Sequence, residues 1–197
     1  MTDTLVAASP LSWDNALRVL RGRLHVAPAL TEEVVAEVCR GLRIPTSAFP
    51  TDTEAAPLRL VRGASEFLRR ISAFLPVVTL SNVVCVEADL NRLSSVLGSS
   101  VVDHFPSCRI GYAKPDRRAF EAVAMYWGIR TSQILHVGDH WECDILGATA
   151  AGARAVWISG GRVRPGERGP APSRIEVVTD LAAAGRHVCH LFSRRAQ

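Results

Sequence analysis

The chain has 197 residues, 48% hydrophobic and 21% charged, a balance typical of a globular protein rather than a disordered one. The length fits one domain, or one domain with a modest insertion. No apolar run approaches the ~20 residues of a membrane span, and the N-terminus shows no signal-peptide pattern. We therefore expect a cytoplasmic protein with no membrane partner.

The basic residues do not indicate a nucleic-acid partner, although the net charge is +4. They are scattered, and no basic stripe with interleaved aromatic residues is present. The 5 cysteines form no CxxC pair and have no histidine at zinc spacing, so we expect reduced thiols. The oligomeric state cannot be read from these features.

The first part of the chain, residues 10–62, predicts helices and no strands. Apolar residues at helical spacing predict one helix from Ser12 to about Leu24. A second helix is expected from the N-cap Thr31 to Leu42. Residues 50–57 are polar and contain two prolines, which predicts a linker.

From Gly63 onward, apolar runs alternate with helical patterns. We expect strands at 76–80, 134–137, 154–158 and 175–178, with helices between them and after the last. Strands that alternate with helices favour a parallel sheet covered on both faces. The predicted fold class is therefore α/β, with a doubly wound parallel sheet.

Polar residues follow two of these strands. Ser81 and Asn82 come after the first, and Asp139 comes after the second, with Asp144 five positions on. Ligands of doubly wound sheets bind beyond the carboxyl ends of the strands, and paired carboxylates suit Mg²⁺. A helix cap at Asp139 and a solvated Asp144 would explain this pair equally well.

Lys114 is the one lysine among 23 basic residues. It precedes Pro115 at the expected start of a helix, where a compact cation could meet a phosphate. An ordinary exposed lysine is the alternative interpretation.

Three segments together resemble the second, third and fourth motifs of the haloacid dehalogenase (HAD) superfamily of hydrolases. They are residues 77–82, residues 111–120, and residues 134–139 with Asp144. The resemblance covers about residues 58–182. It implies a HAD-like Rossmannoid core at 63–197, a small helical cap at 10–62, and a remnant of the first motif at 1–9.

The resemblance also implies a Mg²⁺-dependent hydrolase of small phosphate monoesters that works through an aspartyl-phosphate. It assigns Ser81, Asn82 and Lys114 to the phosphate. It assigns Asp139 to Mg²⁺, with Asp144 as a further ligand or as support for the site, and it leaves open which carboxylate is the direct ligand.

The family's first motif is matched in part, because Thr4-Leu5 correspond to its end. Thr2 then takes the place of the usual acid/base aspartate, and the nucleophilic aspartate would lie one residue before Met1. Either the start is misplaced, which we favour, or the nucleophile has been lost. We expect the chain as printed to be inactive and poorly stable, because the family's first strand is central in the sheet.

Two other functions stay open at this stage. A non-catalytic HAD-like binding module would keep the fold without the chemistry. A haloacid dehalogenase proper would need no metal, and the Asp139/Asp144 pair argues against it.

Overall fold

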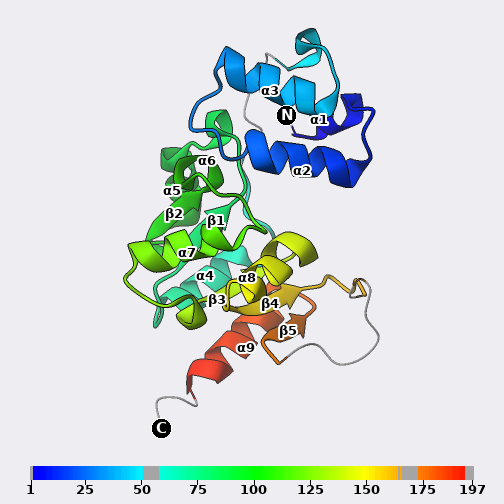
Figure 1. Cartoon of the computed structure of the whole chain (residues 1–197). Coiled ribbons are helices and arrows are strands. Elements are labelled where there is room, and N and C mark those ends of the chain that lie inside the picture. The colour runs from blue at the N-terminus through cyan, green and yellow to red at the C-terminus, as the bar shows by residue number, and fades with distance from the viewer. Residues whose placement is uncertain (1, 51–57, 164, 166–172, 194–197) are drawn as a thin grey trace.

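The computed structural model describes residues 2–50, 58–163, 165 and 173–193. A helical N-terminal segment lies beside an α/β part that contains the strands (Figure 1). The helical segment consists of α1 (Thr2–Ala8), α2 (Trp13–Arg23), α3 (Glu32–Leu42) and a 3₁₀ turn (Thr46–Ala48). The helices predicted at 12–24 and 31–42 are confirmed, while the linker predicted at 50–57 lies almost wholly outside the described residues.

The helical segment has its own hydrophobic core. Leu5 of α1, Leu20 of α2 and Leu42 of α3 are fully buried in it. The hydroxyl of Thr31 accepts a hydrogen bond from the Val34 amide at 3.3 Å, so Thr31 is the N-cap that the sequence predicted. Residues 1–9 were expected to be a remnant of the family's first motif. Residues 2–8 form α1 instead, and the buried Leu5 and Val6 of this helix contribute to the core of the helical segment.

The α/β part alternates strands and helices as predicted. Its strands are β1 (Val78–Ser81), β2 (Asp103–Pro106), β3 (Leu135–Gly138), β4 (Arg154–Ile158) and β5 (Ile175–Val178). Its helices are α4 (Ala64–Ser72), α5 (Leu90–Leu97), α6 (Ser107–Ile110), α7 (Arg117–Tyr126), a π-helix (Trp141–Leu146), α8 (Gly147–Ala150) and α9 (Leu181–Ser193), with 3₁₀ turns at Cys85–Glu87, Gly98–Ser100 and Thr131–Gln133.

The strands form two parallel sheets instead of the single sheet that we expected. One contains β1 and β2, and the other has the order β3-β4-β5. The strand β2 was missed in the sequence because Asp103 and His104 interrupt its apolar pattern. The α/β class and the parallel pairing are confirmed.

Helices cover both faces of the larger sheet. On β4, Ala155 and Trp157 pack in a core with Phe120 of α7, whereas Val156 packs in a second core with Ala184 of α9. Successive residues of a strand point to opposite faces, so these two cores lie on the two sides of the sheet. The arrangement is the doubly wound one that the sequence predicted.

Gly147, the first residue of α8, lies against the loop that carries Lys114. A Cβ atom at this position would come within 2.9 Å of the Pro115 Cα and 3.1 Å of a Phe120 ring carbon. Neither the backbone of Pro115 nor the buried ring of Phe120 can move freely. The close approach of α8 to this loop therefore requires a glycine.

Gly147→Ala is expected to lower the free energy of unfolding by about 1–3 kcal/mol, because the added methyl overpacks this contact. Gly22→Ala in α2 is the matched control. Gly22 is exposed with nothing within 4 Å, so its replacement should stabilise the helix by about 0.5–1 kcal/mol. Urea denaturation of both variants measures the change in the free energy of unfolding. An unchanged value for Gly147→Ala would contradict the packing argument.

Candidate active site

Lys114 is held by its backbone at the end of β1. The side-chain amide of Asn82 donates to the Lys114 carbonyl at 2.7 Å, and its oxygen accepts from the Lys114 amide at 2.7 Å. This two-bond clamp joins the residue after β1 to the loop before α7, although the two are far apart in sequence. Asn82 therefore positions Lys114.

The side chain of Lys114 forms a buried ion pair with Asp144. Lys114 Nζ lies 2.6 Å from Asp144 Oδ1, and the two side chains are 11% and 8% exposed. The same oxygen lies 3.3 Å from His136 Nε2 in β3, and Asp144 Oδ2 accepts from the His140 amide at 2.9 Å. Both oxygens of Asp144 are thus engaged within the protein.

Asp144 and His136 have shifted pKa values. Burial acts to raise the pKa of Asp144, but the hydrogen bond to His136 and the charge of Lys114 outweigh it and hold the pKa well below its usual 3.8. Burial and the Lys114 cation lower the pKa of His136, although its contact with Asp144 opposes the shift. Near neutral pH, a neutral His136 and an ionised Asp144 face Lys114.

Asp139 differs from Asp144 because its carboxylate is exposed. Its Oδ2 lies 3.7 Å from Arg162 Nη2, and its side chain is 75% exposed. Its backbone is fixed, since the Asp139 carbonyl accepts from Trp157 Nε1 at 3.1 Å and from Arg162 Nη2 at 2.8 Å. The turn after β3 thus presents an accessible carboxylate on a held backbone.

The residues after the two strands share a cavity of about 580 Å³ between β1 and β3. Ser81, Lys114, Asp139 and Asp144 line it at the carboxyl ends of the strands. The structure brings these four predicted residues together, and Asn82 reaches them through its clamp on Lys114. The backbone of Thr2 begins α1, but its side chain is outside the described residues, so its role stays a prediction.

Sequence reasoning missed His136 and Arg162. His136 is a polar residue inside an apolar strand, and that pattern signals a buried partner. Arg162 lies in a loop of glycines and arginines, where no spacing singles it out.

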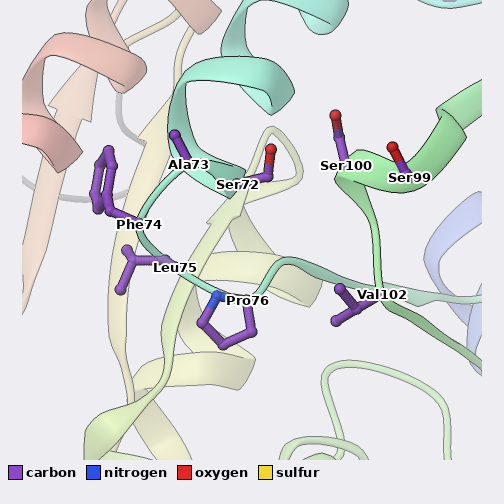
Figure 2. A pocket seen from close by; sticks show the side chains of 8 residues that line it. All are labelled: Ser72, Ala73, Phe74, Leu75, Pro76, Ser99, Ser100 and Val102. Atoms are coloured by element: carbon purple, nitrogen blue, oxygen red, sulfur yellow. The ribbon is translucent and has the colours of Figure 1, made fainter.

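A second hollow, of about 450 Å³, lies before β1 (Figure 2). Hydroxyl groups of Ser72, Ser99 and Ser100 and the apolar side chains of Phe74, Leu75, Pro76 and Val102 line it. It contains no ionisable side chain, and it is at the amino end of β1, away from Ser81. It is therefore not the candidate active site.

The carboxylates suit a hard cation in different ways. Mg²⁺ binds through one or two carboxylates together with water and substrate phosphate. Asp139 fits a direct ligand because its carboxylate is exposed. Asp144 fits a support for Lys114, since both of its oxygens already accept hydrogen bonds. Among the described residues, no three His, Cys, Asp or Glu side chains group closely enough to hold a metal alone.

Comparisons with known proteins report what the chain is similar to in sequence and in fold. The family described as HAD-hydrolase-like matches residues 111–184, which contain Lys114, Asp139 and Asp144. The phosphoserine phosphatase of Thermus thermophilus is 36% identical over 81 residues, 39% of this chain and 32% of that protein. The match therefore spans about a third of this relative's length.

Solved structures share the fold. A 2-haloacid dehalogenase from Pseudomonas syringae pv. Tomato has a TM-score of 0.63 at 20% identity, covering 95% of this chain and 84% of that one. YfnB from Bacillus subtilis, solved bound to magnesium, has a TM-score of 0.53 at 21% identity, covering 67% and 55%. Residues 111–184 thus match a HAD-hydrolase-like family model, and the chain shares its fold with haloacid dehalogenases, as the three motifs indicated. None of the described helices has the length and hydrophobicity that a bilayer span requires.

Asp144→Asn should lower the free energy of unfolding by about 3–5 kcal/mol, because it leaves Lys114 buried without its counter-charge. It should also reduce the acid sensitivity of stability. The folded pKa of Asp144 is depressed, so its contribution is present above about pH 4 and is lost as pH falls through the folded value.

Denaturant titrations between pH 5 and pH 3 measure both effects. Asp139→Asn is the matched control, because it removes an exposed carboxylate from the same turn and should cost less than about 0.5 kcal/mol. Selective isotope labelling of lysine lets NMR follow the Lys114 side chain directly as the pH falls, since Lys114 is the one lysine of the chain. If the free energy of unfolding fell equally steeply with pH in the wild type and in Asp144→Asn, the depressed pKa of Asp144 would be contradicted.

Proposed function

We propose that the chain is a Mg²⁺-dependent hydrolase of small phosphate monoesters. The observation that carries this proposal is the buried Lys114, held by Asn82 and Asp144 in one cavity with Ser81 and Asp139. A buried cation at the carboxyl ends of parallel strands suits a phosphoryl group.

Each residue has a distinct task in this proposal. Lys114 and Ser81 bind phosphoryl oxygens and stabilise the charge that develops during transfer. Asn82 fixes the backbone of Lys114, and Asp144 orients its ammonium group. Asp139 would hold Mg²⁺, which neutralises phosphate charge when it is bound.

The attacking carboxylate comes from the family resemblance. An aspartate would attack phosphorus and displace the alcohol, and water would then release phosphate from the aspartyl-phosphate. Thr2, at the position of the acid/base aspartate, cannot protonate the leaving group at neutral pH. We therefore expect slow turnover, or a preference for substrates with good leaving groups.

The similar proteins include both phosphatases and dehalogenases, and they do not support the two reactions equally. A relative that is 36% identical over 81 residues is named a phosphoserine phosphatase. YfnB and the dehalogenase from Pseudomonas syringae share the fold at 21% and 20% identity, which carries no chemistry to this chain. The exposed Asp139 favours the metal-dependent reaction, because an accessible carboxylate is the kind of ligand that Mg²⁺ takes together with water and substrate phosphate.

Phosphate release from O-phosphoserine and from an aryl phosphate tests the proposal. The assay compares the printed chain with the same chain preceded by an apolar strand that ends in Asp directly before Met1. We expect activity from the longer protein, loss of activity with EDTA, and no halide release from 2-chloropropionate. Halide release without metal would instead indicate a dehalogenase.

In the same longer protein, Asp139→Asn should weaken Mg²⁺ binding more than Asp144→Asn does. The reason is that Asp139 is accessible while Asp144 is occupied by Lys114 and His136. Titration calorimetry measures this order. Phosphate or Mg²⁺ binding without any turnover would favour the non-catalytic module.

Lys114→Arg should reduce turnover at least about hundredfold, the order expected when a transition-state donor is lost. Arg keeps the charge, but its larger planar head does not fit where Nζ contacts Asp144 at 2.6 Å. Vanadate affinity should fall with the rate. Arg109→Lys, a charge-conserving exchange on α6, is the control, and near-normal turnover in Lys114→Arg would contradict the role of Lys114.

A further inference from the structure

The loop after β4 turns back sharply at two glycines. Gly160 and Gly161 have positive φ angles of 58° and 83°, which glycine adopts without a steric penalty. The Arg162 amide donates to the Ser159 carbonyl at 3.0 Å and closes the turn. This short sequence of residues 159–162 therefore returns Arg162 to the carboxyl end of β4.

Backbone carbonyls fix the guanidinium group of Arg162. Its Nε donates to the Ser159 carbonyl at 2.8 Å. Its Nη2 donates to the Asp139 carbonyl at 2.8 Å and to the Ile158 carbonyl at 3.2 Å. These acceptors lie at the carboxyl ends of β3 and β4, which pair side by side (Figure 1). The guanidinium is thus held by the ends of two neighbouring strands.

The third nitrogen of this guanidinium, Nη1, has no hydrogen-bond partner within the part of the chain that the structure describes. It carries two N–H donors, and the Arg162 side chain is 57% exposed. The ring of Trp157 covers one face of the group, with its centroid 6.0 Å from Arg162 Cζ. Arg162 therefore presents two donors to solvent from a fixed position.

Asp139 does not use these donors. Its Oδ2 lies 3.7 Å from Arg162 Nη2, which is beyond hydrogen-bond distance, and its side chain is 75% exposed. Exposed ion pairs of this length contribute little to stability. An anionic group of a ligand that accepts short hydrogen bonds from Nη1 can therefore compete with Asp139 for this cation.

We propose that Arg162 binds a second anionic group of the substrate, a carboxylate a few bonds away from the phosphate ester. Asp139 connects the two places, because it lines the 580 Å³ cavity together with Lys114 and also lies beside Arg162. A guanidinium matches a planar carboxylate, whereas the compact ammonium group of Lys114 suits a phosphoryl oxygen. The substrate class is then the phosphate monoester of a small hydroxy acid, and this inference rests on the proposed function.

Capping of the strand ends is the competing role for Arg162. It would explain the three bonds to carbonyls, but it gives no use to the exposed Nη1 beside Asp139. Arg174 has such a capping role at the other end of the sheet, where its Nη1 donates to the Gly152 carbonyl at 3.1 Å, just before β4. Arg174→Gln is therefore the matched control for Arg162→Gln.

Two ligands that differ by one carboxylate test the inference. O-phospho-L-serine and O-phosphoethanolamine share a phosphate ester and an amine, and only the first carries a carboxylate. Titration calorimetry with Mg²⁺ present measures the affinity of the printed chain for each. Because we expect this chain not to hydrolyse them, both affinities can be measured at equilibrium.

The wild type should bind phosphoserine at least about tenfold more tightly than phosphoethanolamine, the order expected for a hydrogen bond between charged groups. Arg162→Gln should weaken phosphoserine binding alone and reduce this preference to less than about twofold. Arg162→Lys keeps the charge without the planar group and should retain part of the preference. Arg174→Gln should leave the preference unchanged, and urea denaturation shows that the variants are folded.

Two results would overturn the inference and leave the hydrolase proposal standing. One is equal affinity of the wild type for the two ligands. The other is an equal loss of affinity for both ligands in Arg162→Gln, since that result would leave Arg162 with capping as its role. If the folded wild type binds neither ligand, the inference and the proposed phosphate site are both wrong.

Discussion

The buried contact between Lys114 and Asp144 connects all the parts of the candidate active site. It joins the loop before α7 to the π-helix after β3 at 2.6 Å. Breaking a buried pair leaves an uncompensated charge, which costs more than the pair itself contributes. Asn82 bonds the backbone of Lys114, and His136 and the His140 amide contact the two oxygens of Asp144. The site is therefore rigid where a phosphate would bind, and accessible at Asp139.

The cavity between β1 and β3 separates the two sheets of the α/β part. If β1 and β3 paired directly, the cavity that Ser81, Lys114 and Asp139 share would close. The helices on both faces instead keep the strands apart, and backbone groups on two edges lack a strand partner. Each such group costs about 1–3 kcal/mol if it is buried and unsatisfied.

The helical segment is attached to the α/β part close to the site. Val84, which follows β1, is fully buried in the core of the helical segment. Arg21 of α2 lies 3.3 Å from Glu142, which is between Asp139 and Asp144 in the sequence. Movement of the helical segment would therefore strain the turns that carry the site residues. We expect this segment to influence which substrates reach Asp139.

Local sequence determined the helices, most strands and the residue types of the site. The apolar spacings of α2 and α3 and the cap of α3 at Thr31 are short-range features, and the structure confirms them. The strand β2 could not be read, because Asp103 and His104 are polar and parallel pairing with β1 is what makes the segment a strand. Sequence favoured Asp139 over Asp144 as the Mg²⁺ ligand only through its place at the end of a strand. The burial of Asp144 and its contacts with Lys114 and His136 needed the tertiary structure, because the partners come from other segments of the chain. The cavity cannot be read from the sequence either. It lies between β1 and β3, which are 53 residues apart in the chain (residues 82 to 134) and meet only in the folded structure.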